Sequence, residues 1–389
     1  MLVAVLGVIM RYKIGFEFPY FEQKHLQNAH SHFAFSGWVS QALMVLLTSM
    51  IRKGLQESRI RMYNLLLSVN LITSVAMLIT FTAEGYGPFS TTCSAVTIAI
   101  AFCFAFVFYR DLRTAEQVAQ KNWFNAALLF NVLSTLGTAV LVYMMATGHL
   151  HQKTYLSAIY WYLHFQYNGW FFMACMGLFA HHYHSLIRNA PIPPLVFHLF
   201  SWSMLPTFGL SVLWLNLSLP LYLLVILGAA AQAAGWAIVW KTVRKGGLLQ
   251  HPATDFNARV LFLFIAVSVT IKLLLQLASV HPELNTLVFG FRNIVIAYLH
   301  LILLAIITVA LITFFYVKGI VSRGKRSVAG IRIFIAGIFL NEVALAVQGL
   351  ASFQYIPIPK INELLFVIAL VIWAGLLILL SGQGKKSQG

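Results

Sequence analysis

The chain has 389 residues, of which 60% are hydrophobic and only 9% are charged, a balance that excludes an ordinary water-soluble globular protein of this length. Apolar stretches of about 20 residues recur along it, each long enough to cross a hydrocarbon core of about 30 Å as a helix. Alternation of period two is absent, so the pattern indicates membrane helices rather than a β-barrel. The formal charge of +16 has to be explained by where the basic residues lie.

The apolar stretches predict eleven clear membrane-spanning helices. In chain order they cover residues 27–51, 60–83, 88–109, 122–147, 155–180, 194–216, 219–240, 257–279, 286–317, 328–352 and 361–381. A twelfth is expected at the front, where Met1 to Met10 is apolar but only about 15 Å long at 1.5 Å per residue. Either this helix is truncated or the natural start lies upstream, since a cleaved signal peptide fits the segment poorly. We therefore predict an all-α integral membrane protein, a single domain over residues 1–389 made of twelve transmembrane helices.

The basic residues fall mainly on one side of this predicted topology. Counting the partial first helix, nineteen of the 26 Lys and Arg residues lie in the loops after even-numbered helices or in the C-terminal tail. The other loops hold five, namely Arg11, Lys13, Lys24, Lys153 and Lys360. The positive-inside rule places the basic loops and both termini in the cytoplasm. The charge is thus explained by topology, no nucleic-acid partner is expected, and the predicted location is a bacterial inner membrane.

Five of the thirteen histidines lie within predicted spans, away from the cytoplasmic loops: His30, His32, His164, His198 and His300. Ionisable groups are costly in a bilayer and usually face the bundle interior. The helices that carry His30, His164 and His300 all run from outside to inside, which puts these three imidazoles in the outer half of the membrane. Three imidazoles at one depth favour haem iron or copper. The alternative, that each bonds a hydroxyl or a backbone carbonyl, stays open on the residues alone.

A second group of histidines lies in "FAHHYHS", at positions 181, 182 and 184. These side chains could bind a metal as a cluster, but they sit where a predicted helix reaches the cytoplasm. We expect them to be solvated or to contact lipid headgroups.

Three segments resemble one known family. They are "LQNAHSHFAFSGWVSQAL" at 26–43, "YWYLHFQYNGWFFMACMGLF" at 160–179 and "FRNIVIAYLHLILL" at 291–304. In them, and in its predicted topology, the chain resembles the catalytic subunit of haem–copper oxidases, cytochrome c oxidase subunit I. The likeness is closest to the C-type (cbb-type) branch and its nitric oxide reductase relatives. It is specific only in these three helices.

The resemblance assigns roles to the histidines. His30 and His300 stand where the family ligates its low-spin haem, whereas His32 points about 200° away round the helix. His164 stands where a histidine ligates the active-site copper. The other ligands of the oxygen-reducing centre are replaced, because Val212 and Leu213 take the places of two copper-binding histidines. Tyr298 likewise stands where a histidine holds the high-spin haem.

These substitutions imply a membrane haem protein that keeps a bis-histidine low-spin haem b for electron transfer. No CxxCH motif is present, so the haem would not be attached covalently. Copper is not expected, and His164 would be a remnant ligand or would orient another group. Tyr298 could ligate haem iron as tyrosinate, although a structural tyrosine is the preferred interpretation. Arg292 could pair with a haem propionate, or simply reach the interfacial water.

Whether the protein is an enzyme stays open, since the catalytic centre is incomplete. One alternative is a working terminal oxidase or nitric oxide reductase with His198 and Tyr298 as divergent ligands. Another is a haem-free polytopic transporter whose histidines bind substrate or relay protons. Besides membrane lipid, the partners implied by the resemblance are a quinol, a c-type cytochrome or other subunits of a respiratory chain.

Overall fold

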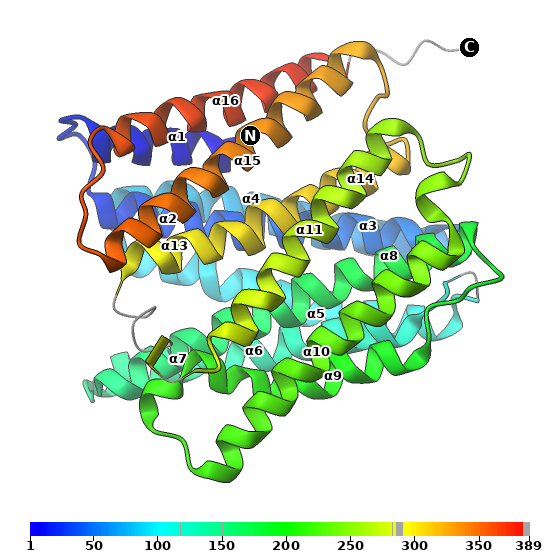
Figure 1. Cartoon of the computed structure of the whole chain (residues 1–389), viewed down its shortest axis with the longest axis horizontal. Coiled ribbons are helices and arrows are strands. Elements are labelled where there is room, and N and C mark those ends of the chain that lie inside the picture. The colour runs from blue at the N-terminus through cyan, green and yellow to red at the C-terminus, as the bar shows by residue number, and fades with distance from the viewer. Residues whose placement is uncertain (117, 150, 282, 285–290, 384–389) are drawn as a thin grey trace.

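The computed structural model describes residues 1–116, 118–149, 151–281, 283–284 and 291–383, and its regular elements over these ranges are helices (Figure 1). The α-helices are α1 (Leu2–Gly15), α2 (Gln23–Phe33), α3 (Gln41–Ile51), α4 (Glu57–Glu84), α5 (Pro88–Thr114), α6 (Lys121–Thr147), α7 (Gln152–His164), α8 (Met173–Leu186), α9 (Pro194–Thr207), α10 (Leu219–Gly246), α11 (Phe256–Ala278), α13 (Arg292–His300), α14 (Val309–Val317), α15 (Lys325–Phe353) and α16 (Ile361–Ser381). The π-helical segments are η1 (Ala34–Ser40), η3 (Phe165–Phe172) and η7 (Leu301–Thr308). Short 3₁₀ turns are η2 (Arg52–Gly54), η4 (Phe208–Ser211), η5 (Leu213–Leu215) and η6 (Leu248–Gln250).

Nine helices in the described ranges are long and apolar enough to cross a membrane. They are Gln23–Gly54, α4, α5, α6, α10, α11, Arg292–Val317, α15 and α16. The helix from α7 through η3 to α8 is long but less apolar. Helices α1 and α9 have 14 residues each, which is about 21 Å at 1.5 Å per residue and short of a full crossing. The chain is therefore a helical, multi-pass integral membrane protein.

Most helices extend a few residues beyond the predicted spans, and two predicted spans differ further. The first helix does not stop at Met10, because α1 continues through Arg11 and Lys13, and Lys13 Nζ donates to the carbonyl of Phe18. The span predicted over 194–216 is not one helix: α9 contains Pro206 and ends at Thr207, after which η4 and η5 carry the chain onward. Proline lacks the N–H that a helix interior needs, so the tighter turns follow it. Residues 286–290 of a further predicted span lie outside the described residues.

The helices run roughly side by side along the long axis, with α1, α15 and α16 on one side of the bundle and α9 and α10 on the other (Figure 1). Small residues allow the closest approaches. A Cβ atom added to Gly375 of α16 would lie 2.6 Å from the backbone nitrogen of Phe334 in α15. Such contact between helix backbones is typical of membrane bundles. The bundle thus gains its packing from close helix pairs as well as from large side chains.

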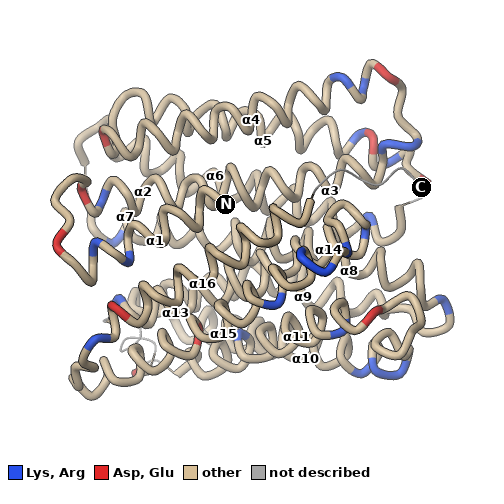
Figure 2. The backbone as a smooth tube through the Cα atoms, turned by 90° about the horizontal axis from the view of Figure 1, so that it is seen from above, with Lys and Arg blue, Asp and Glu red and all other residues tan. Residues whose placement is uncertain are grey.

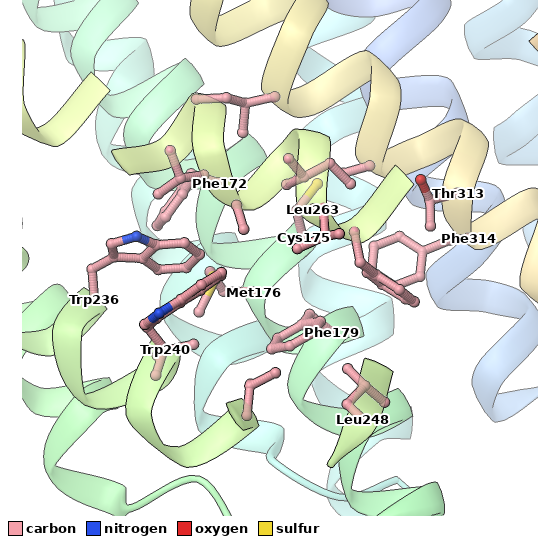
Figure 3. Close-up of a pocket in the computed structure, with 18 of the residues that line it drawn as sticks. Phe172, Cys175, Met176, Phe179, Trp236, Trp240, Leu248, Leu263, Thr313 and Phe314 are labelled. Carbon is pink, nitrogen blue, oxygen red and sulfur yellow. The ribbon is translucent and has the colours of Figure 1, made fainter. Parts of the chain in front are cut away.

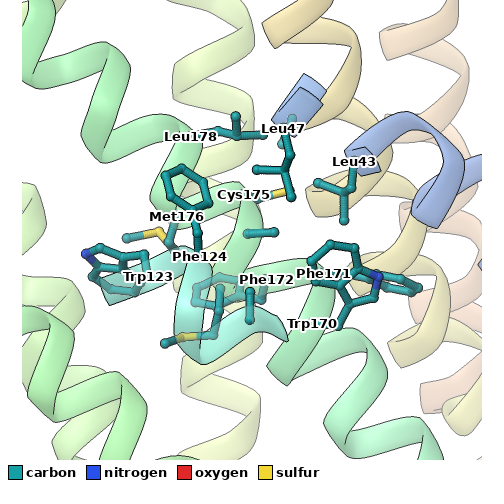
Figure 4. Packing of buried hydrophobic residues seen from close by; sticks show 14 of the residues in the cluster. Leu43, Leu47, Trp123, Phe124, Trp170, Phe171, Phe172, Cys175, Met176 and Leu178 are labelled. Atoms are coloured by element: carbon teal, nitrogen blue, oxygen red, sulfur yellow. The ribbon is translucent and has the colours of Figure 1, made fainter. Parts of the chain in front are cut away.

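The largest core cluster is aromatic. Trp123, Phe124, Trp170 and Phe171 are each at most 1% exposed and gather around the turns of α6, η3 and α8 (Figure 4). Large rings fill this volume with few rotatable bonds. The helix that carries His164 is thereby held at the centre of the protein.

Charge and apolar surface complete the membrane pattern. Most Lys, Arg, Asp and Glu residues lie toward the two ends of the bundle (Figure 2). Large apolar side chains such as Leu129, Val142, Leu227 and Leu350 are more than half exposed on its sides. In a water-soluble protein such an apolar surface would promote aggregation, whereas in a membrane it lies against lipid tails.

Candidate functional site

Each of the three helices that the sequence singles out for its histidines changes to π-helix just after the histidine. His164 is directly followed by η3, His300 is directly followed by η7, and η1 begins four residues after His30. A π-helical segment holds one extra residue per turn and re-aims the side chains beside it, and such segments are frequent at functional sites. The three helices therefore share a local feature that hydropathy does not reveal.

Two indole hydrogen bonds connect these three π-helical segments. Trp38 Nε1 in η1 donates to Thr308 Oγ1 in η7 at 3.0 Å. Trp170 Nε1 in η3 donates to Ser40 Oγ in η1 at 3.2 Å. Indole N–H groups buried in an apolar bundle need such acceptors. These bonds therefore join the three histidine-bearing helices six to ten residues beyond their histidines.

The bond between Trp38 and Thr308 also sets the relative depth of two histidines. Helices α2 and α13 start from the same end of the bundle and run in the same direction (Figure 1). Trp38 lies eight residues after His30, and Thr308 lies eight residues after His300. Equal spacing along parallel helices places His30 and His300 at the same level, as two axial ligands of one haem would require. The two rings are also close enough to interact electrostatically.

The hydrogen bond of His300 shows which of its two ring nitrogens carries the proton. Its Nδ1 lies 2.8 Å from the carbonyl oxygen of Ile296, one turn earlier on α13. A carbonyl only accepts, so Nδ1 carries the proton and Nε2 of the neutral ring keeps a free lone pair. Histidines that ligate metals commonly donate their other N–H to a backbone carbonyl in this way.

His30 supplies an unpaired nitrogen. Its Nδ1 is buried and lacks a hydrogen bond, the one histidine nitrogen of that kind among the described residues. The ring of His30 lies against α1, beside the backbone of Val3 and at a point where a Cβ added to Gly7 would be 3.7 Å from Cε1. A buried polar atom without a partner is costly unless a ligand occupies it. This nitrogen is therefore a candidate ligand atom.

His32 points elsewhere. Its ring stacks on Phe81 with 4.3 Å between ring centroids, and its Nε2 lies 3.0 Å from the hydroxyl of Tyr86. Both partners belong to α4 or to the turn that follows it. His32 therefore packs α2 against α4, on a different side of α2 from His30.

Two arginines lie near His30 and His300. Arg292, at the start of α13, donates from Nη2 to Gln27 Oε1 of α2 at 2.9 Å. Arg11 of α1 interacts electrostatically with both His30 and His300. Sequence reasoning counted Arg11 only as a loop charge. Arg11 directly follows the apolar run at 1–10, so extending the predicted first helix by a few residues would have placed Arg11 on α1.

Tyr298 does not face His30. It packs against the large aromatic core, and its hydroxyl is near enough to that of Tyr167 in η3 to interact electrostatically. Tyr298 is two residues before His300, about 200° round the helix. The two side chains thus lie on different faces of α13.

His164 has both ring nitrogens occupied by protein. Nε2 lies 2.9 Å from the carbonyl oxygen of Met204 in α9, and Nδ1 lies 3.2 Å from Nδ2 of Asn168. The carbonyl requires Nε2 to be the donor, so Nδ1 accepts from the amide. At 3% exposure the ring is fully satisfied, and in this arrangement it joins α7 to α9.

The Met204 carbonyl extends this contact into a longer buried polar chain. Thr207 Oγ1 also donates to Met204 O, Gln232 Nε2 donates to Thr207 Oγ1 at 3.2 Å, and Gln276 Nε2 donates to Gln232 Oε1 at 2.9 Å. Lys272 Nζ completes it with a bond of 2.7 Å to Gln276 Oε1. Lys272 is 4% exposed and lies 5.8 Å from the ring centroid of Phe172. Gln276 belongs to the same helix as Lys272, α11, and the chain of bonds beyond it reaches α10, α9 and α7.

The positions that matched copper-binding histidines are apolar and buried. Val212 and Leu213 are 4% and 9% exposed, between η4 and η5. His198 is exposed on the surface of α9, with its ring against Phe197. It does not join His164 or Tyr298 in the interior.

Comparison with known proteins adds no assignment. No protein-family model and no curated protein matches the chain. In the part of the chain that the structure describes, no group of three or more His, Cys, Asp or Glu side chains surrounds one metal position. The candidate site consists of His30 and His300, whose rings are close enough to interact electrostatically.

Proposed function

We propose that the chain binds one low-spin haem b between α2 and α13, with His30 and His300 as axial ligands. The observation that carries this proposal is that His30 has a buried, unpaired Nδ1 and lies near His300, whose Nε2 is left free by the bond to Ile296. A haem with two imidazole ligands transfers single electrons and has no open position for oxygen. The function proposed is therefore electron transfer within a membrane.

The two nearby arginines fit the charge of a haem. Haem carries two propionates, and Arg292 and Arg11 are cations beside the two histidines. Guanidinium groups pair well with carboxylates. In this proposal Arg292 exchanges its bond to Gln27 for a propionate, and Arg11 acts from α1.

We propose that an oxygen-reducing centre is lacking. His164 uses both nitrogens within the protein, Tyr298 packs into the aromatic core, and Val212 and Leu213 have no ligating atoms. Together these support a protein of the haem–copper oxidase type, with twelve transmembrane helices and both termini in the cytoplasm of a bacterium, that has kept its electron-transfer haem. Its electron partners would be a quinol, a c-type cytochrome or another respiratory subunit.

The test is a reduced-minus-oxidised spectrum of the purified protein, with haem and metal analysis. We expect about one bis-histidine b-type haem per chain, no stoichiometric copper, and no spectral change when carbon monoxide is added to the reduced form. His30→Ala and His300→Ala should each abolish the low-spin spectrum, whereas the matched His32→Ala should keep it. A CO-reactive haem with copper would favour the active oxidase or nitric oxide reductase. A colourless protein would favour the transporter.

A further inference from the structure

An apolar pocket lies between α8, α10, α11 and α14, and neither His30 nor His300 is among its lining residues. Its walls include Phe172, Phe179, Trp236, Trp240 and Phe262, and its other lining residues are almost all aliphatic (Figure 3). The one hydroxyl in the lining, that of Thr313, already donates to the carbonyl of Val309. The pocket thus offers no polar partner within its walls, which suits a hydrocarbon chain.

Basic side chains flank the end of this pocket where α8, α10 and α14 finish. His182 stacks on Phe262, a wall residue, with 6.1 Å between ring centroids and 20° between planes. His251 and Lys318 are close enough to His182 to interact with it electrostatically. We name His182, His251 and Lys318 the basic rim.

The local structure explains why rim and wall lie together. His182 follows the wall residue Phe179 by three positions on α8, and Lys318 follows Phe314 by four at the end of α14. Residues three or four apart on a helix share one face. His251 comes directly after η6, whose Leu248 and Leu249 line the pocket. Three separate elements therefore each place an apolar side chain in the wall and a basic side chain just beyond it.

The basic rim has no carboxylate partner in the described ranges, where the one ion pair joins Arg59 and Asp111. The nearest acidic residue in sequence is Asp255, four residues after His251. Its carboxylate already accepts from the backbone N–H of Ala258 and from the hydroxyl of Tyr316. The positive charge of the rim is thus left for a ligand from outside the chain.

We infer that this pocket and the basic rim form a binding site for an anionic phospholipid. One acyl chain lies in the pocket among Phe172, Trp236 and Trp240, and the phosphate accepts hydrogen bonds from the rim. Imidazole N–H groups and an ammonium are both phosphate donors, and basic residues at a membrane surface select anionic lipids. A quinone would match the apolar walls, but its uncharged head would leave the charge of Lys318 unmatched. The site does not depend on the haem assignment.

Native mass spectrometry of the full chain, delipidated and titrated with phosphatidylglycerol or phosphatidylcholine of identical acyl chains, tests this site. We expect phosphatidylglycerol to bind more tightly by about fivefold or more. Lys318→Gln combined with His182→Gln should remove that preference. The matched change Arg61→Gln, at an exposed basic residue near the start of α4 and outside the pocket lining, should keep it.

A second measurement locates the acyl chain. Phosphatidylglycerol brominated on its chains should quench tryptophan fluorescence, and the quenching should fall in Trp236→Phe and Trp240→Phe. Ala266→Phe, which fills the pocket, should lower binding of the lipid without changing any haem spectrum. Equal binding of the two lipids, unchanged selectivity in the Lys318 and His182 variant, or stronger binding of a quinone at the same residues would overturn the inference.

Discussion

Trp38 and Thr308 are joined by a hydrogen bond of 3.0 Å between Nε1 and Oγ1, although they are 270 positions apart in the chain. His30 and His300 are separated by the same 270 positions. Because α2 and α13 run in the same direction, this one bond keeps the two imidazoles level. It is a positioning contact, eight residues from each histidine on its helix.

We expect Trp38→Phe and Thr308→Val each to lower the free energy of unfolding by about 0.5–1.5 kcal/mol, the usual range for one buried hydrogen bond. The double variant should lose less than the sum, because both changes remove the same bond. Reversible unfolding in mixed detergent micelles would measure the coupling. Strict additivity would show that the bond contributes nothing.

Arg292 offers a prediction on the proposed haem. Replacement by Gln removes a cation that favours the reduced, less positive iron, so the midpoint potential should fall by tens of millivolts, as expected for a charge about 10 Å away at an effective dielectric constant near 20. Arg292→Lys keeps the charge and should keep most of the potential. A redox titration followed at the haem absorption band measures both. An unchanged potential in Arg292→Gln would place this arginine away from the haem.

His164 should prove structural. His164→Leu leaves Asn168 Nδ2 and one acceptor site of the Met204 carbonyl unpaired, at a cost of about 1–3 kcal/mol in the free energy of unfolding. The haem spectrum should stay unchanged, because His164 bonds α9 and Asn168 rather than α2 or α13. Unfolding curves and spectra of the same preparation give both quantities. Loss of haem or of bound copper in this variant would assign His164 to a cofactor instead.

Substitutions in the buried hydrogen-bonded series that ends at Lys272 should differ in their effect on the free energy of unfolding. Lys272→Met removes a buried ammonium, and none of the residues in this hydrogen-bonded series is a carboxylate. The avoided cost of desolvating the ammonium should offset the lost hydrogen bond to Gln276, so the free energy of unfolding should stay equal or rise. Gln232→Leu breaks the chain at its middle and leaves the Nε2 amide N–H of Gln276 without its acceptor, which should cost about 1–3 kcal/mol. Thermal unfolding of the two variants compares them directly. A severe loss in Lys272→Met alone would indicate that the charge itself is required.

Close packing of α15 on α16 can be tested at one glycine. Gly375→Ala places a Cβ 2.6 Å from the backbone nitrogen of Phe334, which a side-chain rearrangement cannot relieve. Separation of the two helices should lower the free energy of unfolding by about 1–3 kcal/mol. Gly324→Ala is the matched control, since its new Cβ meets only Ser322 Oγ at 3.4 Å. Equal stability of the two variants would contradict this packing.

The sequence by itself determined which segments are helices. Hydropathy is a local property, and a backbone in lipid has to satisfy its hydrogen bonds within each segment, so apolar runs of sufficient length read directly as helices. Within the described ranges a helix occupies every predicted span, apart from the end of the span at 194–216, where Pro206 and two 3₁₀ turns intervene. The sequence also singled out His30, His164 and His300 as imidazoles within three membrane helices.

Tertiary structure decided what each of those imidazoles can do. The bond of His164 Nε2 to the Met204 carbonyl and the approach of Arg11 to His30 both depend on residues of other helices. So does the level pairing of His30 with His300, which follows from Trp38 meeting Thr308 across 270 residues. Helix periodicity specifies which face a residue occupies but not which helix that face meets. Only the packing of the helices in three dimensions sets those partners, because each contact joins residues that are far apart in the sequence.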